Sequence, residues 1–195
     1  MPRINSLNSN KQTPDGPDRK PSHWPQHLRY LTSCTYHSSV TPTVQQHVQL
    51  APRATSNLKG PKFSIRPISD PAHPANGQFG LFAAQRIPAK TRILYYIGEI
   101  HCEDREDSNY DLSLCRLPEG TSVGIDATSM GNEARFVNDF RGIAKKPNAI
   151  FVDERTSSGE LVMGIWSSGE QIQKGEEILV SYGKSWWKSR AEEPG

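Results

Sequence analysis

Two short segments toward the C-terminal end of the sequence carry the polar residues best suited to chemistry. The first, GNEARFVND, runs from Gly131 to Asp139 and contains an Arg and an Asn, and the second, GEEILVSYG, runs from Gly175 to Gly183 and contains a Tyr. Neither segment is a repeat or a biased run, and about forty residues separate the Asn from the Tyr. Polar groups that converge from distant parts of a chain are typical of a binding or catalytic site. We therefore expect both segments to face one site.

The elements that must position these segments are predicted to be short strands. Runs of β-prone residues bounded by turn residues occur at 63–68, 80–84, 92–100, 110–117, 122–127, 149–166 and 176–182. The run 149–166 predicts a hairpin around the turn TSSG. Only GNEARFVND is expected to form a helical turn or two. The folded part is therefore expected to be mainly β.

The composition suggests one ordered domain with less ordered additions. The chain has 195 residues, of which 34% are hydrophobic, with 15 Gly and 15 Pro, and its mean hydropathy is −0.66. This is polar for a chain that is folded throughout. We expect a disordered basic N-terminal arm over residues 1–61 with one brief helix near 44–50, a folded domain over 62–188, and a tail over 189–195.

The charge is unevenly distributed. The formal net charge of +2 is too small to indicate a nucleic-acid-binding protein by itself. The arm, however, is basic, with only Asp15 and Asp18 opposing Arg3, Lys11, Arg19, Lys20, Arg29, Arg53 and Lys59. Two readings stay open for the arm, a solvated tail without a partner and a contact with nucleic acid.

The cysteines and the apolar runs indicate in which cellular compartment the protein is expected to lie. Cys34, Cys102 and Cys115 are widely spaced and form no CxxC pair, so neither a disulfide framework nor a metal site is indicated. No run approaches the roughly 18 apolar residues of a membrane span. We expect no membrane association and a reducing compartment, the nucleus or cytoplasm. Because the N-terminus is rich in Ser and Thr and poor in acidic residues, organellar targeting is the alternative.

Four segments, in this order, carry a resemblance to a known family: NGQFGLFA, YYIGE, RFVND and GEEILVSYG. They extend from Gly77 to about Trp187, which is most of the expected domain. In sequence and order they resemble the SET domain family of protein-lysine methyltransferases. The resemblance implies a SET-type β fold of short strands and small sheets with a C-terminal pseudoknot, and it implies transfer of a methyl group from S-adenosyl-L-methionine to a lysine, with a histone as the expected substrate class.

The resemblance also implies which residues bind the cofactor. NGQFGLFA is similar to a segment that contacts the cofactor through its backbone, although Gln78 stands where the family usually has Gly. RFVND is similar to a segment whose Arg and Asn hold the methionine part of the cofactor, a task suited to Asn because its side chain both donates and accepts hydrogen bonds. The cofactor-binding residues implied are Gln78, Phe79, Gly80, Tyr110, Arg135, Asn138 and Asp139.

The catalytic residues implied by the resemblance are two tyrosines. Tyr182 would align the methyl group and the attacking nitrogen, and Tyr96 would wall the lysine channel, where a phenol offers an apolar ring with a polar tip. Desolvation and a nearby positive sulfur favour the neutral lysine amine, so no dedicated base is required. The expected substrate channel comprises Phe151, Val180, Trp186 and Trp187.

The sequence departs from the family pattern in two places. Asp139 replaces the usual His, and we expect its carboxylate to pair with Arg135 or Arg141. The cysteine-rich segment that often follows the catalytic Tyr is absent from KSWWKSRAEEPG, so no zinc is expected there and the two tryptophans are candidates to cover the channel. These departures keep a second function open, a catalytically weak SET module that binds a peptide or chromatin.

The stretch EDREDSNYD concentrates acidic residues at Glu103, Asp104, Glu106, Asp107 and Asp111. It could attract a basic peptide such as a histone tail. An exposed acidic loop without a partner is the equally weighted alternative.

Overall fold

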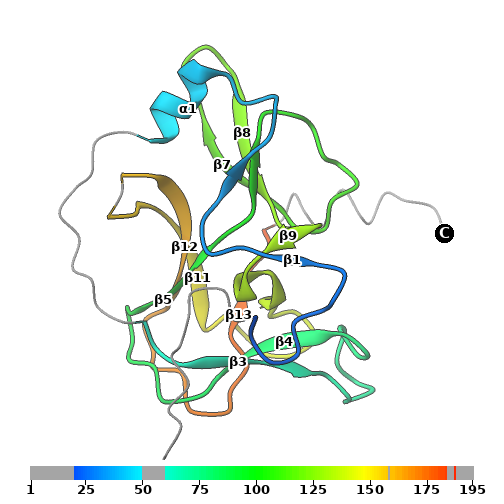
Figure 1. The fold of residues 1–195 in the computed structure, drawn as a ribbon. Coiled ribbons are helices and arrows are strands. Elements are labelled where there is room, and N and C mark those ends of the chain that lie inside the picture. The colour runs from blue at the N-terminus through cyan, green and yellow to red at the C-terminus, as the bar shows by residue number, and fades with distance from the viewer. Residues whose placement is uncertain (1–19, 50–59, 158, 184–186, 188–195) are drawn as a thin grey trace, which may run out of the picture.

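The chain folds into small β-sheets with little helix, and this confirms the mainly β prediction. The computed structural model describes residues 20–49, 60–157, 159–183 and 187. One sheet has three strands, β11 (Ala149–Arg155), β12 (Leu161–Ser167) and β5 (Arg92–Tyr96). A second has four strands, β2 (Thr35–Tyr36), β6 (Glu99–His101), β8 (Ser122–Asp126) and β7 (Asp111–Arg116). Three further sheets have two strands each: β3 (Phe63–Pro67) with β4 (Phe79–Ala83), β1 (Arg29–Tyr30) with β9 (Met130–Gly131), and β10 (Asn138–Asp139) with β13 (Leu179–Val180). Figure 1 shows β7 and β8 at one end of the molecule and β3 and β4 at the other.

The predicted hairpin is present as β11 and β12. The two strands pair antiparallel from Ala149 opposite Ser167 to Arg155 opposite Leu161. β12 then pairs with β5, where Met163 lies opposite Tyr96. Alternation of apolar and polar residues turns one face of such a sheet toward the core. This sheet therefore carries Tyr96 and Phe151 into the same region of the molecule.

The pairing of β10 with β13 brings the two chemistry-bearing segments together. Asn138 lies opposite Leu179 and Asp139 opposite Val180 in a parallel register. The residues between them, including the β11–β12 hairpin, form the long connection that parallel strands require. Just before β10, a single 3₁₀ turn at Glu133–Phe136 is capped by the Asn132 side chain, which accepts from the Ala134 N–H. The helical turn expected in GNEARFVND is thus confirmed.

The expectation of a disordered arm is wrong for residues 20–49, which form part of the folded domain. β1 pairs with β9 and β2 with β6. Apolar side chains of this segment are buried in the core, namely Trp24, Leu28, Leu31, Cys34, Val44 and Val48. The composition of the segment predicts disorder, because Pro, Ser, Thr, Asn, Gln and His dominate it and these apolar residues are few. Residues 1–19 and 50–59 lie outside the described part of the chain.

The brief helix expected near 44–50 is present as α1, Pro42–Val48. It begins at Pro42 because proline is well accommodated in the first turn, and the Thr41 hydroxyl caps it by accepting from the Val44 N–H. Its C-terminal carbonyls are met by Arg155, whose guanidinium donates to the backbone oxygens of Val48 and His47 at 2.9 and 3.3 Å. A β11 side chain therefore ties the N-terminal segment to the hairpin.

The described residues contain no helix long and apolar enough to cross a membrane. Within the same residues no group of His, Cys, Asp or Glu side chains is placed to hold a metal ion. Cys34, Cys102 and Cys115 are free thiols. Burial raises the pKa of the Cys34 thiol to about 12, so this buried thiol stays protonated at neutral pH.

Candidate functional site

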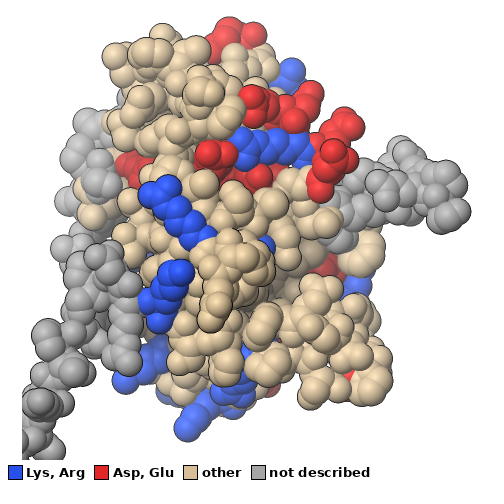
Figure 2. Space-filling model, turned by 45° about the vertical axis from the view of Figure 1, so that its right-hand side comes forward, with Lys and Arg blue, Asp and Glu red and all other residues tan. Residues whose placement is uncertain are grey.

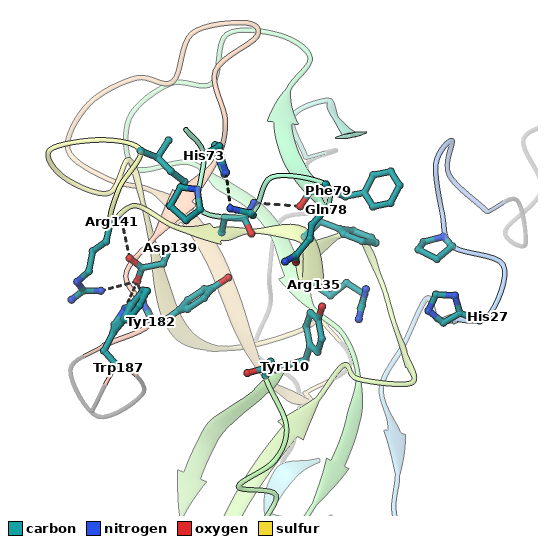
Figure 3. A pocket seen from close by; sticks show the side chains of 18 residues that line it. His27, His73, Gln78, Phe79, Tyr110, Arg135, Asp139, Arg141, Tyr182 and Trp187 are labelled. Atoms are coloured by element: carbon teal, nitrogen blue, oxygen red, sulfur yellow. Dashed lines mark hydrogen bonds and ion pairs between the residues drawn. The ribbon is translucent and has the colours of Figure 1, made fainter. Parts of the chain in front are cut away.

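A cavity of about 600 Å³ lies where the segments RFVND and GEEILVSYG meet. Residues expected to bind cofactor or catalyse line it together, namely Gln78, Phe79, Tyr110, Arg135, Asn138, Asp139 and Tyr182. Trp187, which was expected in the substrate channel, lines it as well. Figure 3 shows Asp139, Arg141, Tyr182 and Trp187 gathered at one end, His27 at the other, and Gln78, Phe79, Tyr110 and Arg135 between them. Tertiary packing thus assembles one site from five separate parts of the chain.

Four expected site residues do not line this cavity, and a fifth is not described. Val180 has a fully buried side chain in the core, at the end of β13 where it pairs with Asp139 of β10. Tyr96 is buried beneath the site, and its ring meets the half-buried Phe151 edge-on at 6.4 Å. Gly80 lies behind the cavity wall. Trp186 falls outside the described residues.

Gly80 is required by a buried carboxylate rather than by an open approach to the cavity. A Cβ at this position would lie 2.5 Å from Oε1 of Glu177 and 2.9 Å from the Phe82 ring. Glu177 itself is only 9% exposed. The absence of a side chain at Gly80 therefore makes room for Glu177 to reach the back of the site.

Glu177 fixes how Asn138 is oriented. Its Oε1 accepts a hydrogen bond from Nδ2 of Asn138 at 2.7 Å, and the same Nδ2 also donates to the backbone oxygen of Phe79 at 3.3 Å. Because a carboxylate and a carbonyl only accept, the NH₂ end of the amide must face them. Asn138 therefore presents its Oδ1, an acceptor, to a ligand.

His73 completes this arrangement from the loop that precedes β4. Its Nε2 lies 3.0 Å from Oε2 of Glu177, with both side chains nearly buried, and its Nδ1 accepts from the Ala75 N–H at 3.0 Å. An Nδ1 that accepts carries no proton, so the proton resides on Nε2 and is donated to Glu177. The three side chains form one chain of hydrogen bonds, His73 to Glu177 and Asn138 to Glu177.

Asp139 binds Arg141 rather than Arg135. Its Oδ2 accepts from Nη1 of Arg141 and its Oδ1 accepts from the Arg141 N–H, each at 2.8 Å. The N–H of Tyr182 also donates to Oδ2, at 2.8 Å. Burial by itself raises the pKa of Asp139, but the N–H groups of Tyr182 and Arg141 outweigh it and hold the pKa below its ordinary value. Asp139 is therefore an ionised anchor within the site.

Arg135 takes a different role. Its Nε donates to the backbone oxygen of Ala127 at 2.9 Å, and its guanidinium carbon lies 4.1 Å from the centre of the Tyr110 ring. A guanidinium stacked on an aromatic face is held in a single plane. Arg135 and Tyr110 thus form a flat cationic wall of the cavity.

The two tyrosine hydroxyls are both engaged with backbone carbonyls. Tyr182 donates to the oxygen of Val137 and Tyr96 donates to the oxygen of Tyr110, at 2.8 and 2.7 Å. Burial raises the pKa of each phenol, and the nearby Tyr182 phenol raises that of Tyr96 further. Both phenols are therefore neutral at physiological pH, and both turn oxygen lone pairs away from those carbonyls.

Two acidic residues of the stretch EDREDSNYD, Glu103 and Asp111, are paired within the protein. Figure 2 shows acidic side chains gathered at the upper part of one face, with basic side chains among them. Arg105 contacts Glu99, Glu103 and Asp126 at 2.8, 3.5 and 2.9 Å. Asp111 contacts the buried His101 at 2.8 Å. Of the stretch EDREDSNYD, the exposed acidic residues outside these pairs are Asp104, Glu106 and Asp107.

Several residues of the cavity were not predicted from the sequence. His73 and Glu177 order Asn138, and Pro25 and His27 supply a wall from the N-terminal segment. Glu177 could have been predicted, because it directly precedes the apolar residues of GEEILVSYG and a carboxylate buried there needs a hydrogen-bonding partner. His73 lies in a loop rich in Pro, Gly and Asn. Nothing in the sequence spacing of His73 or His27 indicates that either residue belongs to a site.

The small-sheet β architecture, with an Asn and a Tyr converging through the β10–β13 pairing, defines a SET-type fold. The family model of the SET domain matches residues 78–183, so the chain belongs to the SET domain family. The fold agrees with a solved structure of ATXR5 in complex with histone H3.1 mono-methylated on R26, with a TM-score of 0.58 and 18% identity over 80% of this chain and 81% of that one.

Two relatives are histone-lysine methyltransferases. The H3 lysine-4-specific histone-lysine N-methyltransferase of Schizosaccharomyces pombe is 34% identical over 112 residues, and histone-lysine N-methyltransferase Set2 of Drosophila melanogaster is 34% identical over 115 residues. Each match covers 53% of this chain but only 11% of the first relative and 4% of the second. The similarity is thus confined to the domain that carries the cavity.

Proposed function

We propose that this chain is an S-adenosylmethionine-dependent protein-lysine N-methyltransferase, that its substrate is a histone lysine, and that it acts in the nucleus. The observation that carries the proposal is the oriented amide of Asn138, whose acceptor is directed to a ligand by Glu177. Family membership and the names of the relatives support the reaction class.

The residues of the cavity fit this cofactor. Its volume of about 600 Å³ is within the range of ordinary ligand sites. The Oδ1 of Asn138 suits the ammonium of an amino acid, and the guanidinium of Arg135 suits a carboxylate. Phe79, Phe136 and Tyr110 supply apolar ring surface for a purine or a sulfonium. When bound, S-adenosylmethionine supplies a methyl group on a positively charged sulfur.

The chain's own contribution is alignment in a desolvated setting. The phenol of Tyr182, which lines the cavity, donates to the carbonyl of Val137, so its oxygen can accept from a reacting group. Tyr96 is buried and donates to the carbonyl of Tyr110, so it supports a residue of the cavity wall. The Tyr182 oxygen can hold the N–H of a lysine amine and the weakly acidic C–H bonds of a methyl group. Methyl transfer is an in-line displacement, so fixed positions lower its barrier.

The incoming lysine must lose its proton before it can attack. Its unperturbed pKa is about 10.4. Neutral tyrosines and buried apolar walls disfavour the charged ammonium, and no side chain of the cavity needs to act as a base. The raised pKa values of Tyr96 and Tyr182 are consistent with this low-polarity setting.

The test is transfer of label from radioactive S-adenosylmethionine to core histones and to unrelated basic peptides. Tyr182→Phe is expected to reduce transfer roughly a hundredfold. The matched control is Tyr95→Phe, because the Tyr95 hydroxyl contacts Arg92 at 2.6 Å on β5, away from the cavity lining. Equal transfer by Tyr182→Phe and wild type would remove the proposed catalytic role.

The second candidate is a weak SET module that binds a peptide or chromatin. The observation that favours it is Asp139, which places a buried negative charge beside Tyr182. Binding of histone tails without any label transfer, with S-adenosylmethionine bound or unbound, would support this module over the enzyme.

A further inference from the structure

We propose that Asp139 is a positioning residue that holds Trp187 in place as the end wall of the cavity. The inference rests on the proposed function only for the identity of the ligand, since the anchoring itself is a property of the protein alone.

The geometry places three donors on one oxygen of Asp139. Its Oδ2 accepts from Nη1 of Arg141 at 2.8 Å, from the N–H of Tyr182 at 2.8 Å and from Nε1 of Trp187 at 3.2 Å. The Asp139 side chain is only 5% exposed. A buried carboxylate with several donors forms charge-assisted hydrogen bonds, which are stronger than neutral ones. One side chain thus joins β10 to the segment that follows β13.

Arg141 strengthens the same contact from the other side. Its guanidinium carbon lies 5.4 Å from the centre of the Trp187 ring and 5.1 Å from that of Phe140. The cation therefore binds the carboxylate of Asp139 and the face of Trp187 at once. Trp187 is held both through its ring N–H and through its ring face.

Trp187 lies at the edge of the cavity, where an anchor would fix the position of its ring. It lines the cavity, and it is 38% exposed, unusually high for a tryptophan. The hydrogen bond from its Nε1 to Asp139 and the Arg141 guanidinium over its ring are directional contacts that favour one position of this exposed ring. Figure 3 shows Asp139, Arg141 and Trp187 together beside Tyr182 at the same end of the cavity. The anchor therefore sets the position of Trp187 relative to Tyr182.

A histidine at position 139 cannot reproduce this arrangement. An imidazole offers at most one accepting nitrogen, whereas three N–H donors converge on Oδ2. A protonated imidazole would also repel Arg141. Asp139→His is therefore expected to weaken ligand binding rather than to improve it.

The first experiment needs no cofactor. In a ¹H–¹⁵N spectrum the ring N–H signal of Trp187 is identified as the one lost in Trp187→Phe. In Asp139→Asn we expect its exchange with water to accelerate about tenfold, because the amide offers a single neutral accepting oxygen to the four N–H donors that the carboxylate holds. The internal control is the ring N–H of Trp166, which donates to Oε1 of Glu154 at 2.8 Å and should not change. An unchanged Trp187 signal in Asp139→Asn overturns the anchor.

The second experiment is calorimetric titration with S-adenosylmethionine. Asp139→Asn and Trp187→Phe should each raise Kd about tenfold, and the double variant should lose no more than Asp139→Asn alone, because both remove the same contact. Trp166→Phe, which removes a similar indole–carboxylate pair away from the cavity, should leave Kd unchanged. Unchanged Kd in both single variants overturns the role of the anchor in ligand binding. A wild type that binds no S-adenosylmethionine while Trp187 stays protected overturns the proposed function and leaves the anchor standing.

Discussion

Nδ2 of Asn138 lies 2.7 Å from Oε1 of Glu177, and this single contact determines which end of the Asn138 amide faces the cavity. The two residues are 39 positions apart and meet because β10 runs parallel to β13. The carboxylate cannot donate, so the amide cannot flip without losing its partner. We therefore expect ligand binding at this site to depend on Glu177, although Glu177 is not among the residues that line the cavity.

Glu177→Gln should weaken binding of S-adenosylmethionine about tenfold, because the new NH₂ group must oppose either the donor of Asn138 or the donor of His73. Calorimetric titration measures this change. Glu176→Gln is the matched control, since Glu176 is exposed and contacts the backbone of Gln173. Equal affinities of the two variants would contradict the orienting role of Glu177.

Gly80→Ala should reduce affinity through the same pair, because its Cβ would stand 2.5 Å from Oε1 of Glu177. The displaced carboxylate releases Asn138, and we expect Kd to rise several-fold together with a stability loss of about 1–3 kcal/mol. Gly169→Ala is the control, since a Cβ there meets nothing within 4 Å. A Gly80→Ala protein with wild-type affinity would show that Glu177 has room to move.

Trp24→Ala should lower the free energy of unfolding by about 3–5 kcal/mol, because it empties a buried position between Tyr30 and Phe136. Urea unfolding monitored by circular dichroism gives the value. Ile150→Ala, at a side chain that is 46% exposed, should change stability by less than about 1 kcal/mol. A small effect of Trp24→Ala would mean that the N-terminal segment adds little to the core.

A fragment that begins at Lys62 should fail to fold stably, whereas one that begins at Lys20 should fold. The shorter fragment lacks Trp24, Leu28 and Val48, whose burial the core requires. We accordingly propose that the domain begins near Lys20 rather than at Lys62. Thermal unfolding of the two fragments distinguishes these outcomes, and a cooperative transition in the Lys62 fragment would restore the shorter boundary.

The anchor at Asp139 should make part of the stability pH-dependent. Its folded pKa lies below the ordinary value, so its contribution is fully present above the unfolded pKa of about 3.9 and is lost as pH falls through the folded pKa. Asp139→Asn should therefore be less stable than wild type at pH 7, by about 1–3 kcal/mol, and this difference should shrink below about pH 4. Urea unfolding at both pH values is the measurement. A difference that stays constant with pH would show that the charge of Asp139 is not involved.

The mainly β fold could be predicted because its signals are local. The hairpin 149–166 consists of two β-rich runs joined by the turn TSSG, and the 3₁₀ turn at Glu133–Phe136 follows its Asn cap. The segments RFVND and GEEILVSYG could likewise be assigned to one site, since their order and residue types resemble those of the SET family. Val180 shows the limit of this approach, because its neighbours in the sequence do not reveal that the core covers it completely.

By itself the sequence predicted most of the strands from Phe63 onward and marked Asn138 and Tyr182 as candidate site residues, but it missed β1, β2, β9 and β10. Only the tertiary structure decided their partners. Asp139 accepts from the N–H of Tyr182, 43 residues later, and Trp24 packs against Phe136 across the domain. Local polarity patterns report which face of a strand is buried, but the partner of a polar group depends on which distant segment packing brings within about 3 Å. For this reason Asp139, which departs from the family's usual His in the sequence, proves in the structure to be held at the site by Arg141 and Tyr182.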